Sequence, residues 1–144
     1  MKHKNELNKL VANLTVIYTK LHSFHWYVNG RSFYTLHTVF ENYYDYTTTT
    51  LDEAAERLLA IGGRPVSTLK GALELATIEE ATEKETTSEM VAAVFHDFEL
   101  LKADLSKLME LSEEEGDQGT SDFALGVKTQ LEKNIWMLKA YLAE

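Results

Sequence analysis

The sequence predicts an all-α protein, a four-helix bundle with one short extra helix in the crossover between its second and third long helices. Four long stretches carry apolar residues at alternating spacings of three and four, the repeat that buries one side of an α-helix. With 44% hydrophobic residues and a single proline among 144, the chain is expected to form one domain, 1–144. The connection between the second and third long helices is too long for adjacent antiparallel helices, which indicates a crossover.

The first helix is expected over residues 5–29. Its apolar residues share one face: Leu7, Leu10, Leu14, Ile17, Leu21, Phe24 and Val28. The Asn29-Gly30 pair ends it, since glycine favours the left-handed conformation that follows many helices. His22 and His25 lie at the edge of the apolar face, and His22 is interpreted as a packing or surface residue.

The second helix, 33–61, has two faces and ends at Gly62-Gly63, just before Pro65. One face is apolar, and the other carries potential ligands: His37, Glu41, Asp45, Thr48, Asp52 and Glu56. The run of threonines at 47–50 has poor helix propensity. The apolar stripe continues in phase on both sides of that run, so we expect the helix to pass through it.

The remaining elements follow from local signals. A short helix is expected over 68–75, inside the connection 64–85. The third long helix opens with Thr86-Thr87-Ser88-Glu89, which has the form of a capping box, and runs to about 113. The fourth is expected over 121–143. His96 and Asp97, on the third helix, are interpreted as surface or interface residues.

The spacing of five side chains predicts a metal site shared between two subunits. His37 and Glu41 are four residues apart, as are Asp52 and Glu56, so each pair lies on one helical face and can bind one ion. His25 can reach His37 across the intervening turn. Asp52, however, lies roughly 22 Å along the helix from His37, whereas ligands sit about 2–2.5 Å from their ion. A two-fold dimer solves this, with the His25 end of one subunit facing the Glu56 end of the other.

At these residues the chain resembles the mini-ferritins, or Dps family (DNA-binding proteins from starved cells), of the ferritin-like superfamily. The matching positions are His25-Trp26, His37, Glu41, Asp52, Glu56 and Gly62-Gly63, and the likeness extends to Asn134-Ile135-Trp136. The resemblance implies an iron-sequestering ferroxidase that oxidises Fe(II), preferably with hydrogen peroxide, between the subunits of a hollow dodecamer. The ferric mineral is stored inside, which protects against oxidative damage.

The resemblance also implies roles for single residues. Some family members have Asp where this chain has Glu41, so Glu41 binds the metal either directly or through water. Trp26 is either an interface residue or an aromatic neighbour that takes up oxidising equivalents. Asp117 and Asp122 are candidates for the lining of a pore that guides Fe²⁺ inward. Asp45, although on the ligand face, is not expected to bind metal.

Composition narrows the function classes. The chain has no cysteine, so metal ligands must be oxygen or imidazole nitrogen, which suits iron better than structural zinc. No apolar run approaches the ~20 residues of a membrane span, and the first ten residues lack the apolar segment of a secretion signal, so we expect a cytoplasmic protein.

Two alternatives compete with the shared metal site. A di-iron centre inside one bundle requires Glu-x-x-His on two helices, and no histidine here has a glutamate three residues before it. A nucleoid protein that coats DNA requires positive charge, but the net charge is −9 and the terminus offers little beyond Lys2, Lys4 and Lys9. DNA binding is therefore expected to be weak or absent.

Overall fold

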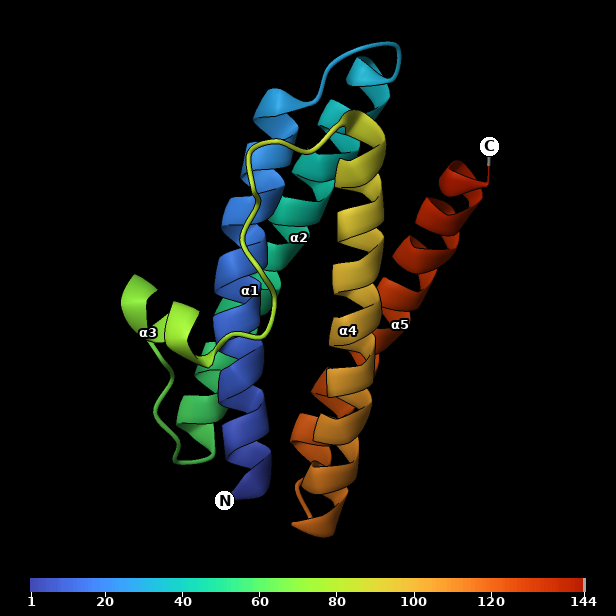
Figure 1. Ribbon diagram of the computed structural model, residues 1–144. Helices are drawn as coiled ribbons and strands as arrows, with labels where there is room; N and C mark the ends of the chain where they lie inside the picture. The colour runs from blue at the N-terminus through green and yellow to red at the C-terminus, as the bar shows by residue number, and fades with distance from the viewer. Residues whose placement is uncertain (144) are drawn as a thin grey trace.

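The computed structural model describes residues 1–143, which form five helices and no strand. The helices are α1 (Lys2–Tyr27), α2 (Phe33–Ala60), α3 (Leu69–Leu75), α4 (Thr87–Glu114) and α5 (Gln118–Leu142). Figure 1 shows two antiparallel hairpins, α1 with α2 and α4 with α5, which pack together through α1 and α4. The segment from α2 to α4 carries α3 and runs back along α1, which confirms the predicted bundle with a short helix in its crossover.

The apolar faces predicted from spacing meet in one core. Its largest fully buried apolar side chains come from α1, α2 and α4: Leu7, Ile17, Leu21, Phe24, Phe40, Leu58, Val91, Val94, Leu101, Leu105 and Leu108. Burying each such side chain contributes about 1.5–3 kcal/mol to folding. No helix within residues 1–143 combines the length and the apolar character that a membrane crossing requires.

Three helix ends differ from the prediction by two or three residues. α1 begins at Lys2, three residues before the predicted start at residue 5. α1 ends at Tyr27, two residues early, because Val28 already has an extended backbone with ψ of 142°. α5 begins at Gln118, three residues early, because the Asp117 side chain caps the helix by accepting a hydrogen bond from the backbone of Thr120 at 3.1 Å.

The threonine run within α2 is helical, as predicted. The hydroxyls of Thr47 and Thr48 each donate to the carbonyl four residues earlier, Tyr43 and Tyr44 respectively, at 2.8 Å. These bonds occupy groups that would otherwise compete with the helix for backbone partners. The run therefore continues the same helical faces from the histidine end of α2 to its carboxylate end.

Buried polar side chains of α1 fasten the crossover to the bundle. Asn13 accepts hydrogen bonds from the backbone of Thr77 and Ile78, at 2.8 and 3.0 Å. Lys20 donates to the carbonyl of Glu79 at 2.8 Å and pairs with Asp97 at 2.8 Å. These bonds fix the position of the long connection that leads into α4.

The interpretation of Asp97 as a surface or interface residue is wrong. It is buried, only 3% exposed, and forms its ion pair with Lys20 inside the subunit. Burial raises the pKa of the Asp97 carboxyl, and the Lys20 ammonium opposes that rise. The sequence does not predict the pairing of Lys20 with Asp97, because the two residues are on different helices. His96 is exposed, as expected.

Candidate metal centre

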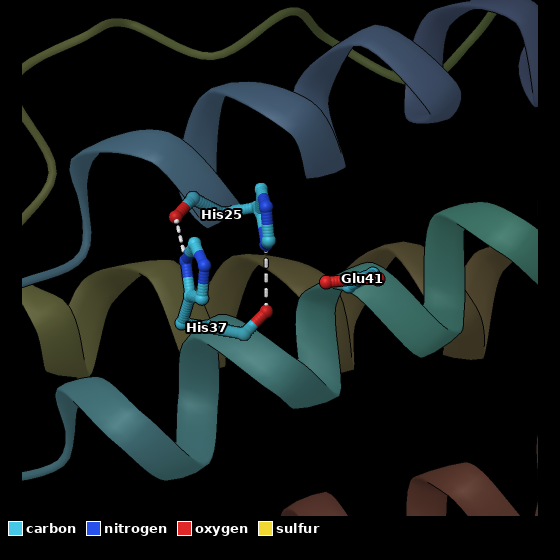
Figure 2. A group of neighbouring side chains, drawn as sticks. All are labelled: His25, His37 and Glu41. Carbon is cyan, nitrogen blue, oxygen red and sulfur yellow. Dashed lines mark hydrogen bonds between the residues drawn. The ribbon is translucent and has the colours of Figure 1, made fainter.

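The two predicted histidines meet where the first hairpin closes. His25 lies in the last turn of α1 and His37 in the second turn of α2, and the intervening loop reverses the chain at Gly30, whose φ is +90°. Figure 2 shows the two imidazoles facing each other between the helices. Their ring centroids are 3.7 Å apart and the planes are 13° from parallel, so the rings are stacked.

Reciprocal hydrogen bonds hold the two rings in place (Figure 2). Nδ1 of His25 donates to the carbonyl of His37 at 2.7 Å, and Nδ1 of His37 donates to the carbonyl of His25 at 2.8 Å. A carbonyl only accepts, so each neutral imidazole carries its proton on Nδ1. The lone pair is then on Nε2, where a metal ion can bind it.

Glu41 completes a three-residue group with these histidines. It lies one turn beyond His37 on α2, and one ligand atom from each of the three residues lies within 4.8 Å of the others. His25 is buried whereas Glu41 is exposed, so the group opens toward the surface of the subunit. Two imidazoles and one carboxylate are a suitable donor set for a divalent first-row transition metal.

The other two predicted ligands lie elsewhere in the subunit. Asp52 and Glu56 are exposed side chains nearer the far end of α2, roughly 22 Å or more from His37 by helix rise. Among residues 1–143 they belong to no group of three potential ligands. Asp45 is exposed and lies outside the group as well. A single subunit therefore brings together three of the five predicted ligands.

The two pore candidates differ in their surroundings. Asp117 accepts from the Arg57 guanidinium at 2.7 Å, from the Thr120 hydroxyl at 2.6 Å and from the His3 ring at 3.2 Å. Burial works to raise the pKa of Asp117, but the bonds from Thr120 and Arg57 outweigh it and hold the pKa at about 2. Asp122 is exposed and, among residues 1–143, accepts a side-chain hydrogen bond from the Gln118 amide alone, at 2.7 Å. A role for either in a pore stays a prediction.

An aromatic cluster beside the histidines was not predicted. Tyr44 meets the His25 ring edge to face, with centroids 5.2 Å apart and planes at 88°. His22, interpreted above as a packing or surface residue, stacks on Tyr44 at 3.7 Å and 19°. Trp26 is 65% exposed and approaches His22 at 5.4 Å. Helical spacing places Tyr44 on α2 but does not show which residues of α1 it touches.

The charge around Tyr44 is negative. Partial burial, followed by the nearby carboxylates of Glu41 and Asp45, raises the pKa of the Tyr44 phenol. The phenol is therefore neutral at ordinary pH. The Tyr44 ring contacts both the predicted metal ligand His25 and the ring of His22.

Comparison with known proteins identifies the family. A family model described as a ferritin-like domain matches residues 4–144. DNA protection during starvation protein 2 of Bacillus anthracis is 51% identical over 136 residues, which cover 94% of this chain and 93% of that protein. This chain belongs to the Dps family of ferritin-like proteins.

Two further similarities agree with this assignment to Dps. General stress protein 20U of Bacillus subtilis (strain 168) is 48% identical over 136 residues, covering 94% of each chain. The crystal structure of Dps from Staphylococcus aureus matches with a TM-score of 0.97 at 42% identity, covering 99% of this chain and 95% of that one. As a Dps protein with this fold, the chain is a mini-ferritin.

Proposed function

We propose that this Dps protein is a ferroxidase. It oxidises Fe(II) with hydrogen peroxide at sites shared between two subunits and stores the ferric product inside a hollow homo-oligomer of twelve. The observation that carries the proposal is a half-complete site. His25, His37 and Glu41 converge on one position, while the two remaining carboxylates of the motif are held roughly 22 Å or more away on the same rigid helix.

A two-fold contact between subunits places each incomplete half against the other. In that arrangement Fe(II) is bound by Nε2 of His25, Nε2 of His37 and Glu56 of the partner subunit. Glu41 and Asp52 of the partner subunit complete this position or form a weaker one beside it. Each dimer then has two equivalent sites, and each site takes ligands from both chains.

The donor set favours the oxidised product. Fe(III) is harder and more highly charged than Fe(II), so it gains more from anionic carboxylate oxygens. Two Fe(II) ions supply the two electrons that, with two protons, convert one hydrogen peroxide to two waters. No hydroxyl radical is released in this balance.

The exposed apolar surface supports an assembly. Large apolar side chains remain uncovered on the outer side of α1 and on α3, including Trp26 and Tyr27 at 65% and 62% exposure and Leu69 at 73%. An isolated soluble subunit rarely leaves such residues clustered at the surface. Trp26, Tyr27, Leu69 and Leu73 line one shallow groove between the two helices.

Size-exclusion chromatography combined with an iron oxidation assay tests the proposal. The protein should elute as a large, closed oligomer, and that fraction should oxidise Fe(II) on addition of peroxide. A monomer with full ferroxidase activity would contradict a site shared between subunits. A coat on DNA is the less well supported function, since Lys9 at the basic terminus is already paired with Glu6 at 3.1 Å and Asp104 at 3.4 Å.

A further inference from the structure

We propose that Arg57 is a positioning residue for Glu56, the ligand that each subunit supplies to the site it shares with its neighbour. The Arg57 guanidinium bonds to the start of α5 and so fixes the rotation of the last turns of α2. That rotation sets where the Glu56 carboxylate lies. This inference rests on the proposed ferroxidase function, and Arg57 itself does not bind the metal ion.

The two ends of α2 are fastened to the bundle by different contacts. At the histidine end, the reciprocal hydrogen bonds of the two imidazoles join α2 to α1. At the other end, within residues 1–143, the side-chain hydrogen bonds from residues 50–60 to other elements all come from Arg57. Its Nε donates to the Thr120 hydroxyl at 2.9 Å and its Nη2 to the Asp117 carboxylate at 2.7 Å. One side chain therefore ties the carboxylate end of α2 to the second hairpin.

Asp117 and Thr120 form a rigid anchor for this guanidinium. Asp117 caps α5 by accepting from the backbone of Thr120 at 3.1 Å, and it also accepts from the Thr120 hydroxyl at 2.6 Å. The buried His3 ring, at the start of α1, contacts the same carboxylate at 3.2 Å. Figure 1 shows that the start of α1, the end of α2 and the start of α5 lie at one end of the bundle. The three meet at Asp117, so its carboxylate has little freedom to follow a movement of α2.

Gly119 leaves the space that the guanidinium occupies. A Cβ at this position would lie 2.6 Å from Nη2 and 2.9 Å from Cζ of Arg57, closer than nonbonded atoms pack. Those atoms end a flexible side chain, so an alanine here would displace the guanidinium and not the backbone. Glycine inside a helix is about 1 kcal/mol less favourable than alanine. Gly126, in the same helix, has nothing within 4 Å of its Cβ position, so the close contact is specific to Gly119.

Rotation of α2 moves Glu56 and Arg57 together, because the two residues are neighbours on one helix. The ends of helical side chains lie about 5–6 Å from the helix axis, so a rotation of about 10° displaces the Glu56 carboxylate by about 1 Å. Metal ligands must stay within about 0.5 Å of their working geometry. Glu56 is exposed and the ends of helices fray, so contacts within the subunit must hold this turn in place. The bonds of Arg57 to α5 meet that need.

Gly119→Ala tests the role of Arg57 without removing a ligand. In the assembled protein it should raise the KM for Fe(II) in peroxide-dependent oxidation about tenfold and leave kcat close to wild type, because it weakens binding of the ion. A titration with Co(II), followed by visible absorption, should show the same weakening without any oxidation. Gly126→Ala is the matched control and should keep both wild-type values. Size-exclusion chromatography and circular dichroism check the assembly and folding of each variant.

Mixed assemblies show which half of the site the variant damages. Co-assembled with His37→Ala, Gly119→Ala supplies intact histidine halves and the other chain intact carboxylate halves. About one quarter of the sites should then bind Co(II) with wild-type affinity. Co-assembled with Glu56→Ala, every carboxylate half is damaged whichever chain supplies it, so no site should reach that affinity. Arg57→Lys keeps the positive charge but loses the paired donors, and it should behave like Gly119→Ala in both mixtures.

Three results would each overturn the positioning role of Arg57. They are wild-type Co(II) affinity in both assembled variants, recovery in the mixture with Glu56→Ala, and no recovery in the mixture with His37→Ala. The proposed ferroxidase function fails on different results. If wild type does not oxidise Fe(II), or if His37→Ala mixed with Glu56→Ala restores no tight sites, the shared ferroxidase centre is wrong whatever Arg57 does.

Discussion

Mixing two inactive variants tests whether each site takes ligands from two subunits. His37→Ala removes a ligand from the half-site that Figure 2 shows, and Glu56→Ala removes one from the other end of α2. Each variant alone leaves every site without one ligand, so each homo-oligomer should oxidise Fe(II) poorly. In a mixed assembly, a site regains both ligands when its histidine half comes from the Glu56→Ala chain and its carboxylate half from the His37→Ala chain.

The expected recovery follows from counting. With equal amounts and random assembly, each half of a site is the correct chain half of the time, so about one quarter of the sites are intact. Peroxide-dependent Fe(II) oxidation by the mixture should therefore reach about one quarter of the wild-type rate per site. The subunits must be co-expressed, or dissociated and reassembled together, so that both variants enter the same assembly.

A matched mixture separates the two architectures. The double variant His37→Ala/Glu56→Ala, assembled with an equal amount of wild type, should also give about one quarter of the activity if sites are shared. Sites drawn from single chains would instead give about one half, and the mixture of single variants would then be as inactive as its parents. That second pattern would refute the shared site. Circular dichroism checks folding, since His37→Ala also removes the hydrogen bond to the His25 carbonyl, worth about 1 kcal/mol.

Three further outcomes are expected. In urea titrations at neutral pH, Asp117→Asn should lower the free energy of unfolding by about 1–2 kcal/mol. This value is reduced for solvent screening, because Arg57 is partly exposed. Because its folded pKa is about 2 and its ordinary value 3.8, this contribution is present above pH 5 and is lost as the pH falls toward 2; equal acid sensitivity of wild type and variant would contradict it. Lys20→Met should lower the free energy of unfolding by about 3–5 kcal/mol, because it leaves Asp97 buried without its partner. A decrease of less than about 1 kcal/mol in urea unfolding would contradict a buried ion pair. Gel shifts at neutral pH and near-physiological salt should show little retention of duplex DNA, and tight metal-independent binding would favour a DNA-coating function.

The sequence alone determined the helices and predicted which three potential ligands the first hairpin brings together. Spacing of three and four along 144 residues defines the apolar faces, and the intervals between His25, His37 and Glu41 place three ligands on facing turns of one hairpin. The same arithmetic shows that Asp52 lies too far from His37 to share an ion within one chain. These inferences succeed because an α-helix has a fixed rise and period, so positions along one helix follow from residue numbers.

Contacts between different helices were decided only by the tertiary structure. The stacking of His25 on His37, the buried pair of Lys20 with Asp97 and the contact of Tyr44 with His22 all depend on how two helices are rotated and shifted against each other. Residue numbers fix the face of a helix but leave open what lies against it. That choice depends on how side chains from several helices fill the core together, and it is made when the helices pack.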